Sequence, residues 1–353
     1  MKINVVSADA LTSDHLTAWR RILADAPELD SPFFRPEYAQ AVAAVRPGVA
    51  IAVLSDARGT VGFFPHERDA SGIGRPAGGA LCDFQGVVAR PGETFDAAQL
   101  VRACGMSAWV FDKLLASQAP FRAHQGLTCD SPFIDLRDGF DAYQAERRRQ
   151  GSETLVQAQR KARKIERELG PLRFAYHVAD RRLFETLLEW KVEQYRRIGA
   201  PNYLAPAWTT ALLERLRQRQ SPEFGGRLSA LFAGDRPVAL HLGLYSHAVF
   251  HVWYPAYDRA LARYSPGLVF WLELLRAAAA QGIARIDLGR GDERYKSSLQ
   301  TGVTRLAEGA VDLRPFAGSL RRGWLRARAA VRASPLRGVG RAVMHYARRW
   351  LGD

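Results

Sequence analysis

The chain has 353 residues, 47% of them hydrophobic and eight of them Trp, which excludes a disordered chain and leaves room for more than one compact domain. No apolar run approaches the ~20 residues of a membrane span, and the N-terminal sequence MKINVVSADALTSDHL lacks the apolar core of a signal peptide, so we expect a cytoplasmic protein. Of the formal net charge of +14, residues 314–353 carry +9, so the basic balance says little about the folded part.

The first half of the chain alternates strand and helix patterns, which indicates an α/β fold with mixed sheets. Strands are predicted at 3–6, 49–54, 60–65, 81–89, 107–114 and 132–136, and helices at 12–26, 35–45 and 97–105. We assign residues 1–138 to an N-terminal domain.

Residues 139–170 read as a basic helical connector that Gly151 interrupts. The helix after Gly151 places four cations on one face, since they are three and four residues apart: Arg160, Lys161, Arg163 and Lys164. They would hold a diphosphate acceptor, a CoA 3′-phosphate or RNA, or they would simply be a solvated charged face.

Residues 171–314 repeat the element order of the first half and form a predicted C-terminal domain. Strands are expected at 172–178, 227–234, 237–245, 249–254, 284–289 and 305–313, and helices at 181–199, 206–219, 266–282 and 292–300. The fold class is therefore α/β, with two domains of one architecture in tandem, joined by the connector.

Residues 315–353 form an Arg-rich tail with scattered apolar residues such as Leu320, Trp324 and Leu325. This pattern predicts either a basic amphipathic helix lying on an anionic membrane surface or a disordered tail. In the first case the cytoplasmic protein would be membrane-associated.

The most informative stretch runs from 249 to 296 and contains VFHVWYPAYDRALARYSPG and GIARIDLGRGDERYK. Together with FFRPEYAQAV, GFFP and LCDFQGVV in the first half, it resembles the CelD-type acetyltransferases associated with bacterial cellulose biosynthesis. The element order resembles the GNAT fold, and two copies in tandem resemble the Fem-type layout. The resemblance covers residues 33–313.

The resemblance implies transfer of an acetyl or other acyl group from acyl-CoA, without a metal, to an amine or hydroxyl acceptor. A small molecule or glycan precursor of polysaccharide (cellulose or exopolysaccharide) or cell-envelope biosynthesis would be that acceptor, and the tail would contact a membrane or a synthase complex. Two alternatives stay open. Fem-type relatives take an aminoacyl group from tRNA, which would be the one nucleic-acid partner, and a non-catalytic GNAT-like module would dock on a synthase.

A Ser-Pro-Gly turn before the helix at 266–282 is the candidate phosphate site, because a helix N-terminus presents free N–H groups and positive charge. GNAT proteins usually have a Gln/Arg-x-x-Gly-x-Gly/Ala loop here, whereas this chain has one glycine. The cofactor-binding candidates are Arg263, Ser265, Gly267 and Leu268. The alternative is an ordinary Ser cap with Pro at the first helical position.

Four residues around the strand 249–254 and the next strand are the catalytic candidates. His251 would take a proton from the acceptor, Tyr257 would protonate the departing thiolate, and Lys296 would stabilise the oxyanion. Asp287 would orient the acceptor or a lysine. Alternation places His251 and Trp253 on one face of the strand and Val252 and Tyr254 on the other. His241 is a rival base that we expect to be a satisfied core residue.

The remaining candidates, expected to bind the acceptor, are polar and aromatic residues near these strand ends and two cations of the basic connector helix. They are Asp83, Gln85, Tyr254, Asp258, Arg290, Tyr295, Arg160 and Lys164. A structural loop is the alternative for Asp83 and Gln85, aromatic packing is the alternative for Tyr254, and Asp292 is a candidate cap of the following helix.

Overall fold

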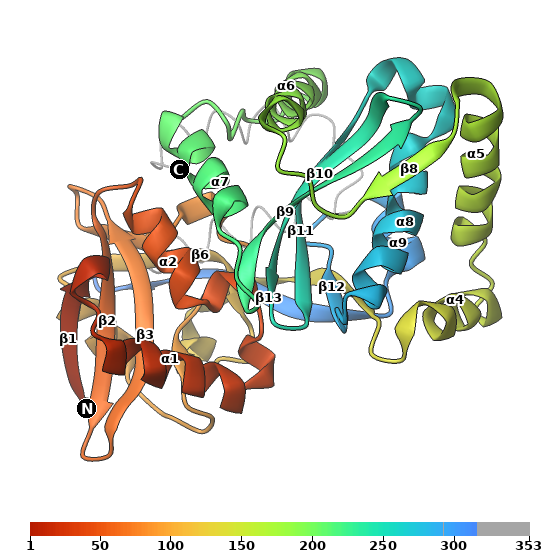
Figure 1. Ribbon diagram of the computed structural model, residues 1–353. Helices are drawn as coiled ribbons and strands as arrows, with labels where there is room; N and C mark the ends of the chain where they lie inside the picture. Colours follow the sequence, from red (N-terminus) through yellow and green to blue (C-terminus); the bar gives the residue numbers. More distant parts are fainter. Residues whose placement is uncertain (292, 316–353) are drawn as a thin grey trace.

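The computed structural model describes residues 1–291 and 293–315, with the side chain of Arg294 excepted (Figure 1). The predictions for Asp292 and for the tail from Phe316 onward lie outside the described residues. One mixed sheet runs through the molecule, and its strands follow the order β1-β2-β3-β4-β6-β13-β7-β12-β11-β10-β9-β8, with β5 paired to β3. Both halves of the chain therefore share a continuous sheet.

The first half supplies seven of these strands and three α-helices. The strands are β1 (Lys2–Ser7), β2 (Val49–Asp56), β3 (Gly59–Arg68), β4 (Ile73–Pro76), β5 (Val88–Ala89), β6 (Ala108–Leu115) and β7 (Gln125–Asp135). The helices are α1 (Ser13–Asp25), α2 (Pro36–Ala43) and α3 (Ala97–Ala103). Thr12 caps the N-terminus of α1, and Pro36 lies in the first turn of α2, as their positions in the sequence predict.

The predicted strand at 81–89 is wrong over most of its length. A short 3-10 helix, Gly79–Leu81, is followed by a loop, and only Val88–Ala89 pair as a strand. The amide of Gln85 holds this loop: it donates to Cys82 O at 3.1 Å and accepts from the N–H groups of Asp112 and Lys113 at 3.0 and 2.9 Å. Side-chain hydrogen bonds and one backbone bridge, from Gln85 to Leu114, thus take the place of a regular ladder.

The connector consists of α4 (Gly139–Arg149) and α5 (Thr154–Leu169), and Gly151, with φ of +78°, separates them as expected. The second half contains α6 (Arg181–Ile198), α7 (Ala207–Gln218), α8 (Pro266–Ala280) and α9 (Arg294–Leu299). Its strands are β8 (Leu172–Ala175), β9 (Phe224–Ala233), β10 (Arg236–Ser246), β11 (Val249–Tyr257), β12 (Arg285–Asp287) and β13 (Gly302–Asp312). Within the described ranges, no helix is both long and apolar enough to cross a bilayer.

The last strand of the second half lies inside the sheet of the first half. β13 pairs antiparallel with β6 on one side and with β7 on the other, and β7 in turn pairs with β12. Figure 1 shows the blue strand β13 among the strands of the first half. The division into domains at residues 138 and 171 stays a prediction, and any such division has to allow for this insertion.

Helices cover both faces of the second half's sheet. The apolar helix α8 packs with α4 and α5 on one face, around Phe250, Val252 and Ile286 (Figure 1). On the other face α6 and α7 cover Leu228, Leu242 and Tyr254. The first half approaches this second face near the end where β11 and β12 part, and the candidate site lies there.

Candidate active site

The strands β11 and β12 separate in the middle of the second half's sheet. They pair in parallel only from Val249 opposite Arg285 to His251 opposite Asp287. β12 then ends, while β11 continues to Tyr257. The backbone of β11 beyond His251 therefore lacks β12 as a partner, which opens a gap at the carboxyl ends of two parallel strands.

A β-bulge at Trp253 changes which side chains face the gap. Leu242 of β10 pairs with Tyr254 and Gly243 pairs with Val252, so Trp253 has no opposite residue. Val252 consequently packs toward α8, whereas Tyr254 packs toward α6. The prediction that Val252 and Tyr254 share a face is wrong, because alternation holds only where no extra residue is inserted.

His251 contacts Asp83 of the first half. Its Nε2 lies 2.9 Å from Asp83 Oδ2, and its side chain is fully buried. Phe33 and Phe84 meet the imidazole edge-on, with ring centroids 4.8 and 5.7 Å away. Nδ1 has no hydrogen-bond partner among the described residues. If Asp83 accepts the Nε2 proton, Nδ1 keeps its lone pair free for a proton.

Asp83 also forms an ion pair with Lys113 of β6. Lys113 Nζ lies 2.9 Å from Asp83 Oδ1 and donates to Ala80 O at 2.6 Å. Burial by itself would raise the pKa of the Asp83 carboxyl, but the Lys113 charge and the His251 hydrogen bond outweigh it and hold that pKa below its usual range. Asp83 is therefore ionised, and its side chain is 21% exposed, more than that of His251.

A glycine turn after β12 lies against the His251–Asp83 pair. A Cβ on Gly289, whose φ is +69°, would lie 3.6 Å from His251 Nε2 and 3.7 Å from Asp83 Oδ2. The buried Lys296 fastens this turn: its Nζ donates to Gly289 O at 3.2 Å and Arg290 O at 3.0 Å, and it pairs with Glu293 at 3.0 Å. These acceptors match the three N–H bonds of the ammonium.

Asp287 is buried beside His251 in the sheet. Its Oδ1 accepts from Arg285 Nε at 2.8 Å, while Oδ2 has no hydrogen-bond partner among the described residues. Arg285 also donates to Thr304 at 2.6 Å. Asp287 therefore joins β12 to β13 through Arg285, and its second oxygen is the atom that remains for an acceptor or a water.

Lys191 and Tyr195 of α6 lie beside the end of β11, with Tyr203 next to Tyr195. Tyr195 and Tyr203 meet edge-on at 5.8 Å, and Tyr195, like Tyr254, lies within the electrostatic field of Asp83. Lys191 donates to Pro255 O and to Gln194, both at 3.0 Å. Burial lowers the pKa of Lys191 to about 8, a change that the nearby Glu293 partly opposes.

The N-terminus of α8 lies near the end of β11. Ser265 adopts a left-handed conformation with φ of +55° and makes no side-chain cap, which excludes an ordinary Ser cap, and Pro266 occupies the first turn as predicted. Two cations gather around Tyr264: Arg263 donates to its hydroxyl at 2.8 Å, and Lys164 Nζ lies 5.5 Å from its ring centroid. Leu268 is half-buried in the α8 core.

Gly267 is left open on its solvent side. Its φ is not positive, and a Cβ would meet only Tyr257, at 3.6 Å, an ordinary contact. Neither backbone conformation nor packing therefore requires glycine here, although glycine weakens a helix by about 1 kcal/mol relative to alanine. Close approach of a ligand to the first turn is a physical reason for its presence.

Other candidates have structural partners. The Gln85 amide is occupied in its loop, and Asp258 caps a 3-10 helix (Arg259–Tyr264) and pairs with Arg236. Arg290 reaches Asp112 O of the first half at 3.3 Å. Tyr295 stacks on Trp271 with centroids 5.0 Å apart. Arg160 is exposed on α5.

His241 is the buried core residue that the sequence indicates. Its Nε2 accepts a hydrogen bond from the backbone N–H of Trp253 at 3.3 Å, so it satisfies the N–H donor of the bulge residue. Burial, with help from Lys191, lowers the pKa of His241 to about 3. The ring is therefore neutral at physiological pH, as an acceptor for Trp253 requires.

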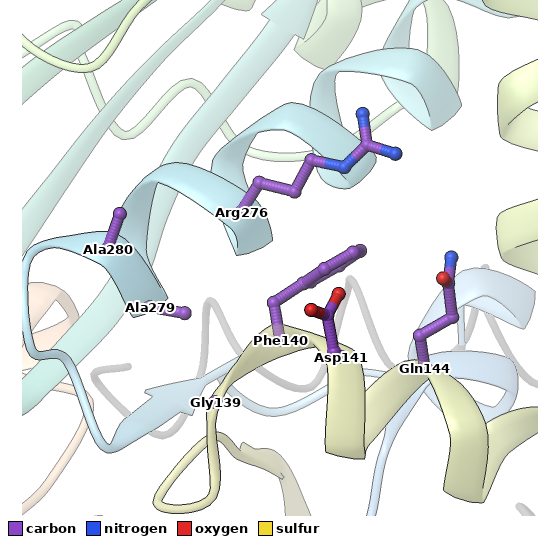
Figure 2. Close-up of a pocket in the computed structure, with 7 residues that line it drawn as sticks. All are labelled: Gly139, Phe140, Asp141, Gln144, Arg276, Ala279 and Ala280. Atoms are coloured by element: carbon purple, nitrogen blue, oxygen red, sulfur yellow. The ribbon is translucent and has the colours of Figure 1, made fainter.

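A cavity of about 450 Å³ lies away from this gap, between α4 and the C-terminal end of α8. Figure 2 shows Phe140, Asp141 and Gln144 of α4 facing Arg276 of α8 across it. A second, of about 420 Å³, lies between α5, β8 and α8. Of the residues singled out in the sequence, Arg163 of the basic helix lines the second cavity, and none of the catalytic candidates lines either cavity.

The sequence patterns did not point to two lysines of the site: Lys113, which pairs with Asp83, and Lys191, which binds Pro255 O of β11. Lysine is rare in this Arg-rich chain, which contains only Lys2, Lys113, Lys161, Lys164, Lys191 and Lys296. That scarcity makes Lys113 and Lys191 as conspicuous in the sequence as Lys296. Lysine differs from arginine in being a compact charge whose pKa shifts when buried, so a rare lysine within an apolar run is a usable signal.

Comparison with known proteins agrees with the fold. Residues 152–297 match the family model described as an acetyltransferase (GNAT) domain. No curated protein matches the chain. Among solved structures, FemX is 10% identical, covers 89% of this chain and 97% of its own, and has a TM-score of 0.57.

Two further structures are similar at 10% identity. A tandem GNAT protein from the clavulanic acid biosynthesis pathway covers 89% of this chain and 99% of its own, with a TM-score of 0.50. The C-terminal domain of a protein provisionally assigned as a lysylphosphatidylglycerol synthetase from Agrobacterium fabrum covers 90% and 96%, with a TM-score of 0.53. The chain thus has a mixed α/β fold similar to that of tandem GNAT proteins, and its residues 152–297 match the GNAT acetyltransferase domain.

Proposed function

We propose that this protein transfers an acetyl or longer acyl group from acyl-CoA to an amine or hydroxyl acceptor in polysaccharide or cell-envelope biosynthesis. The observation that carries the proposal is the gap between β11 and β12, with the His251–Asp83 pair and Tyr254 around it. In this proposal the acyl thioester lies in the gap and the acceptor enters between the two halves.

The N-terminus of α8 would hold the CoA phosphates. Free N–H groups of a first helical turn attract anions, and Arg263 and Lys164 add positive charge on the side of Tyr264. The open space over Gly267 lets a phosphate reach the backbone. This loop has one glycine where two are usual, and the cations and the open backbone supply what a second glycine would otherwise contribute.

The protein's own residues would then handle the proton and the developing charge. Acyl-CoA supplies a thioester whose C–S bond breaks as the acceptor's nitrogen or oxygen bonds to the carbonyl carbon. His251 takes the proton that the acceptor loses, and ionised Asp83 stabilises the resulting imidazolium. The Tyr254 or Tyr257 hydroxyl delivers a proton to the thiolate. Lys296 stabilises the oxyanion if one of its N–H bonds turns from the 289–290 carbonyls toward the gap.

Calorimetry with acetyl-CoA and longer acyl-CoAs tests the donor. We expect saturable binding that weakens in an Arg263→Gln/Lys164→Gln variant. Absence of binding to every acyl-CoA would overturn the CoA part of the proposal. Mass spectrometry of polysaccharide and lipid-linked precursors from a deletion strain would then identify the acceptor by the loss of one acyl mass.

Transfer of an aminoacyl group from tRNA is the second candidate, and α5 is the observation that favours it. Arg160, Arg163 and Arg167 are exposed on this helix, and the fold resembles that of FemX. Binding of charged tRNA that weakens steeply with salt would support this candidate, and an absence of such binding would remove it. A non-catalytic docking role would instead leave His251→Ala and Lys296→Ala strains with full cellular function.

A further inference from the structure

Lys113 makes several contacts to one short loop. From β6, its Nζ reaches Ala80 O at 2.6 Å, Cys82 O at 3.5 Å and Asp83 Oδ1 at 2.9 Å. The side chain of Lys113 is only 11% exposed. A buried ammonium is costly unless its donors are satisfied, so these three acceptors define one position for the Asp83 carboxylate.

The orientation of Asp83 matters because its two oxygens have different partners. Oδ1 faces Lys113, and this leaves Oδ2 for His251 Nε2 at 2.9 Å. Asp83 lies in a loop outside the strands, so strand pairing does not hold its backbone in place. The ion pair and the backbone contacts of Lys113 are what aim the carboxylate across the boundary between the halves.

We propose that Lys113 is a positioning residue for the acyl transfer reaction: it fixes Asp83 against His251 and, by partly cancelling the Asp83 charge, sets the protonation range of the imidazole. This inference rests on the proposed function only for its effect on turnover, since the effect on His251 exists without any substrate. Lys113 has no contact with His251, so it acts through Asp83.

Other charged and titratable groups surround the pair and remain unchanged when Lys113 is replaced. In the first half they are Asp112, the Cys82 thiol, Tyr38 and Glu67, and in the second half they include Asp287, Arg285, Lys296, His241, Lys191, Tyr195, Tyr203 and Tyr254. None of the cations among them replaces Lys113 beside Asp83, because Lys191 is bound to Pro255 O, Lys296 to the carbonyls of Gly289 and Arg290, and Arg285 to Asp287.

The test is an NMR titration of the full chain labelled at its histidines, with the His251 signal assigned by its loss in His251→Gln. In Lys113→Met the removal of a positive charge favours the imidazolium, so the titration midpoint of the His251 ring rises by about one pH unit. Lys113→Arg keeps the charge and returns the midpoint most of the way. A midpoint in Lys113→Met equal to that of the unmodified protein overturns the proposal.

Turnover gives the second readout. Lys113→Met lowers kcat by about 10-fold or more, moves the acid limb of the pH–rate profile upward, and leaves acyl-CoA affinity unchanged. If the unmodified protein has no acyltransferase activity, the proposed function fails while the NMR result still decides on Lys113. An active Lys113→Met protein with an unchanged pH profile contradicts the inference alone.

Two further variants separate positioning from folding. Lys113→Met/Asp83→Asn has no unpaired charge, so its stability recovers relative to Lys113→Met while its turnover does not. Arg217→Met removes a comparably buried cation, paired with Glu214 on α7 at 2.7 Å, and serves as the matched control. It lowers stability and leaves the His251 midpoint in place. Recovery of turnover in the double variant would show that Lys113 only supports the loop.

Discussion

Replacing Gly267 by alanine should make the protein more stable and a poorer binder of acyl-CoA. The residue lies in the first turn of α8, its φ is ordinary, and the added Cβ would meet only Tyr257 Cδ1, at 3.6 Å. Since that distance is a normal van der Waals contact, no repacking is needed. Removing the flexibility of glycine should raise the free energy of unfolding by about 0.5–1 kcal/mol.

The effect on the ligand has the opposite sign. A phosphate that accepts a backbone N–H comes within about 2.9 Å of the nitrogen, and a methyl group next to that nitrogen obstructs it. We expect at least about a 10-fold loss of affinity, equivalent to about 1.4 kcal/mol. Acyl-CoA binding is measured by calorimetry and stability by urea unfolding without ligand.

Ala277→Gly is the matched control, because it makes the reverse change in the interior of the same helix. It should lower the free energy of unfolding by about 1 kcal/mol and leave acyl-CoA affinity unchanged. Unaltered acyl-CoA affinity in Gly267→Ala would refute the placement of the phosphates at this turn. A loss of stability in Gly267→Ala would refute the claim that packing does not require glycine.

Three other changes probe the surrounding structure. Burial depresses the pKa of His241 to about 3, so between about pH 6.5 and 3 the unfolded chain binds a proton that the folded chain does not. The free energy of unfolding therefore falls as the pH drops through this window, by about 2 kcal/mol at pH 5. Urea titrations should show a flatter pH dependence for His241→Gln. Lys296→Met leaves the Gly289 and Arg290 carbonyls without their donor, so it should lower kcat about 10²-fold and also lower the thermal midpoint of unfolding. A loss of kcat at full stability would instead assign Lys296 directly to the oxyanion. Tyr143→Phe removes the buried hydrogen bond from the Tyr143 hydroxyl to Leu299 O at 2.8 Å, which links α4 to α9. It should lower the free energy of unfolding in urea by about 1 kcal/mol and leave acyl-CoA affinity unchanged. A cost near zero would show that this hydrogen bond contributes little.

Local patterns in the sequence predicted the elements that carry the site. The turn at Pro266, the break at Gly151 and the strand that bears His251 follow from Pro and Gly chemistry and from apolar periodicity. These features depend on neighbours within a few residues. A single inserted residue at Trp253 was enough to reverse the predicted face of Tyr254, since alternation carries no information on bulges.

Long-range contacts were not available from the sequence in the same way. Asp83 and His251 were both candidates, but their 2.9 Å contact joins positions 168 residues apart. Lys113 gained its role only when β6 was placed beside the 80–83 loop. The loop itself was mistaken for a strand because its apolar residues are buried by the first half's core, as strand residues would be.

The position of β13 has a consequence for synthesis of the chain. β6 and β7 are consecutive strands, yet the place between them belongs to a strand that ends at Asp312. While the ribosome makes residues 136–301, the first half holds two unpaired edges facing an empty slot, and such edges recruit other strands. A fragment that ends before Gly302 should therefore aggregate, and adding a peptide of residues 302–312 should suppress that aggregation.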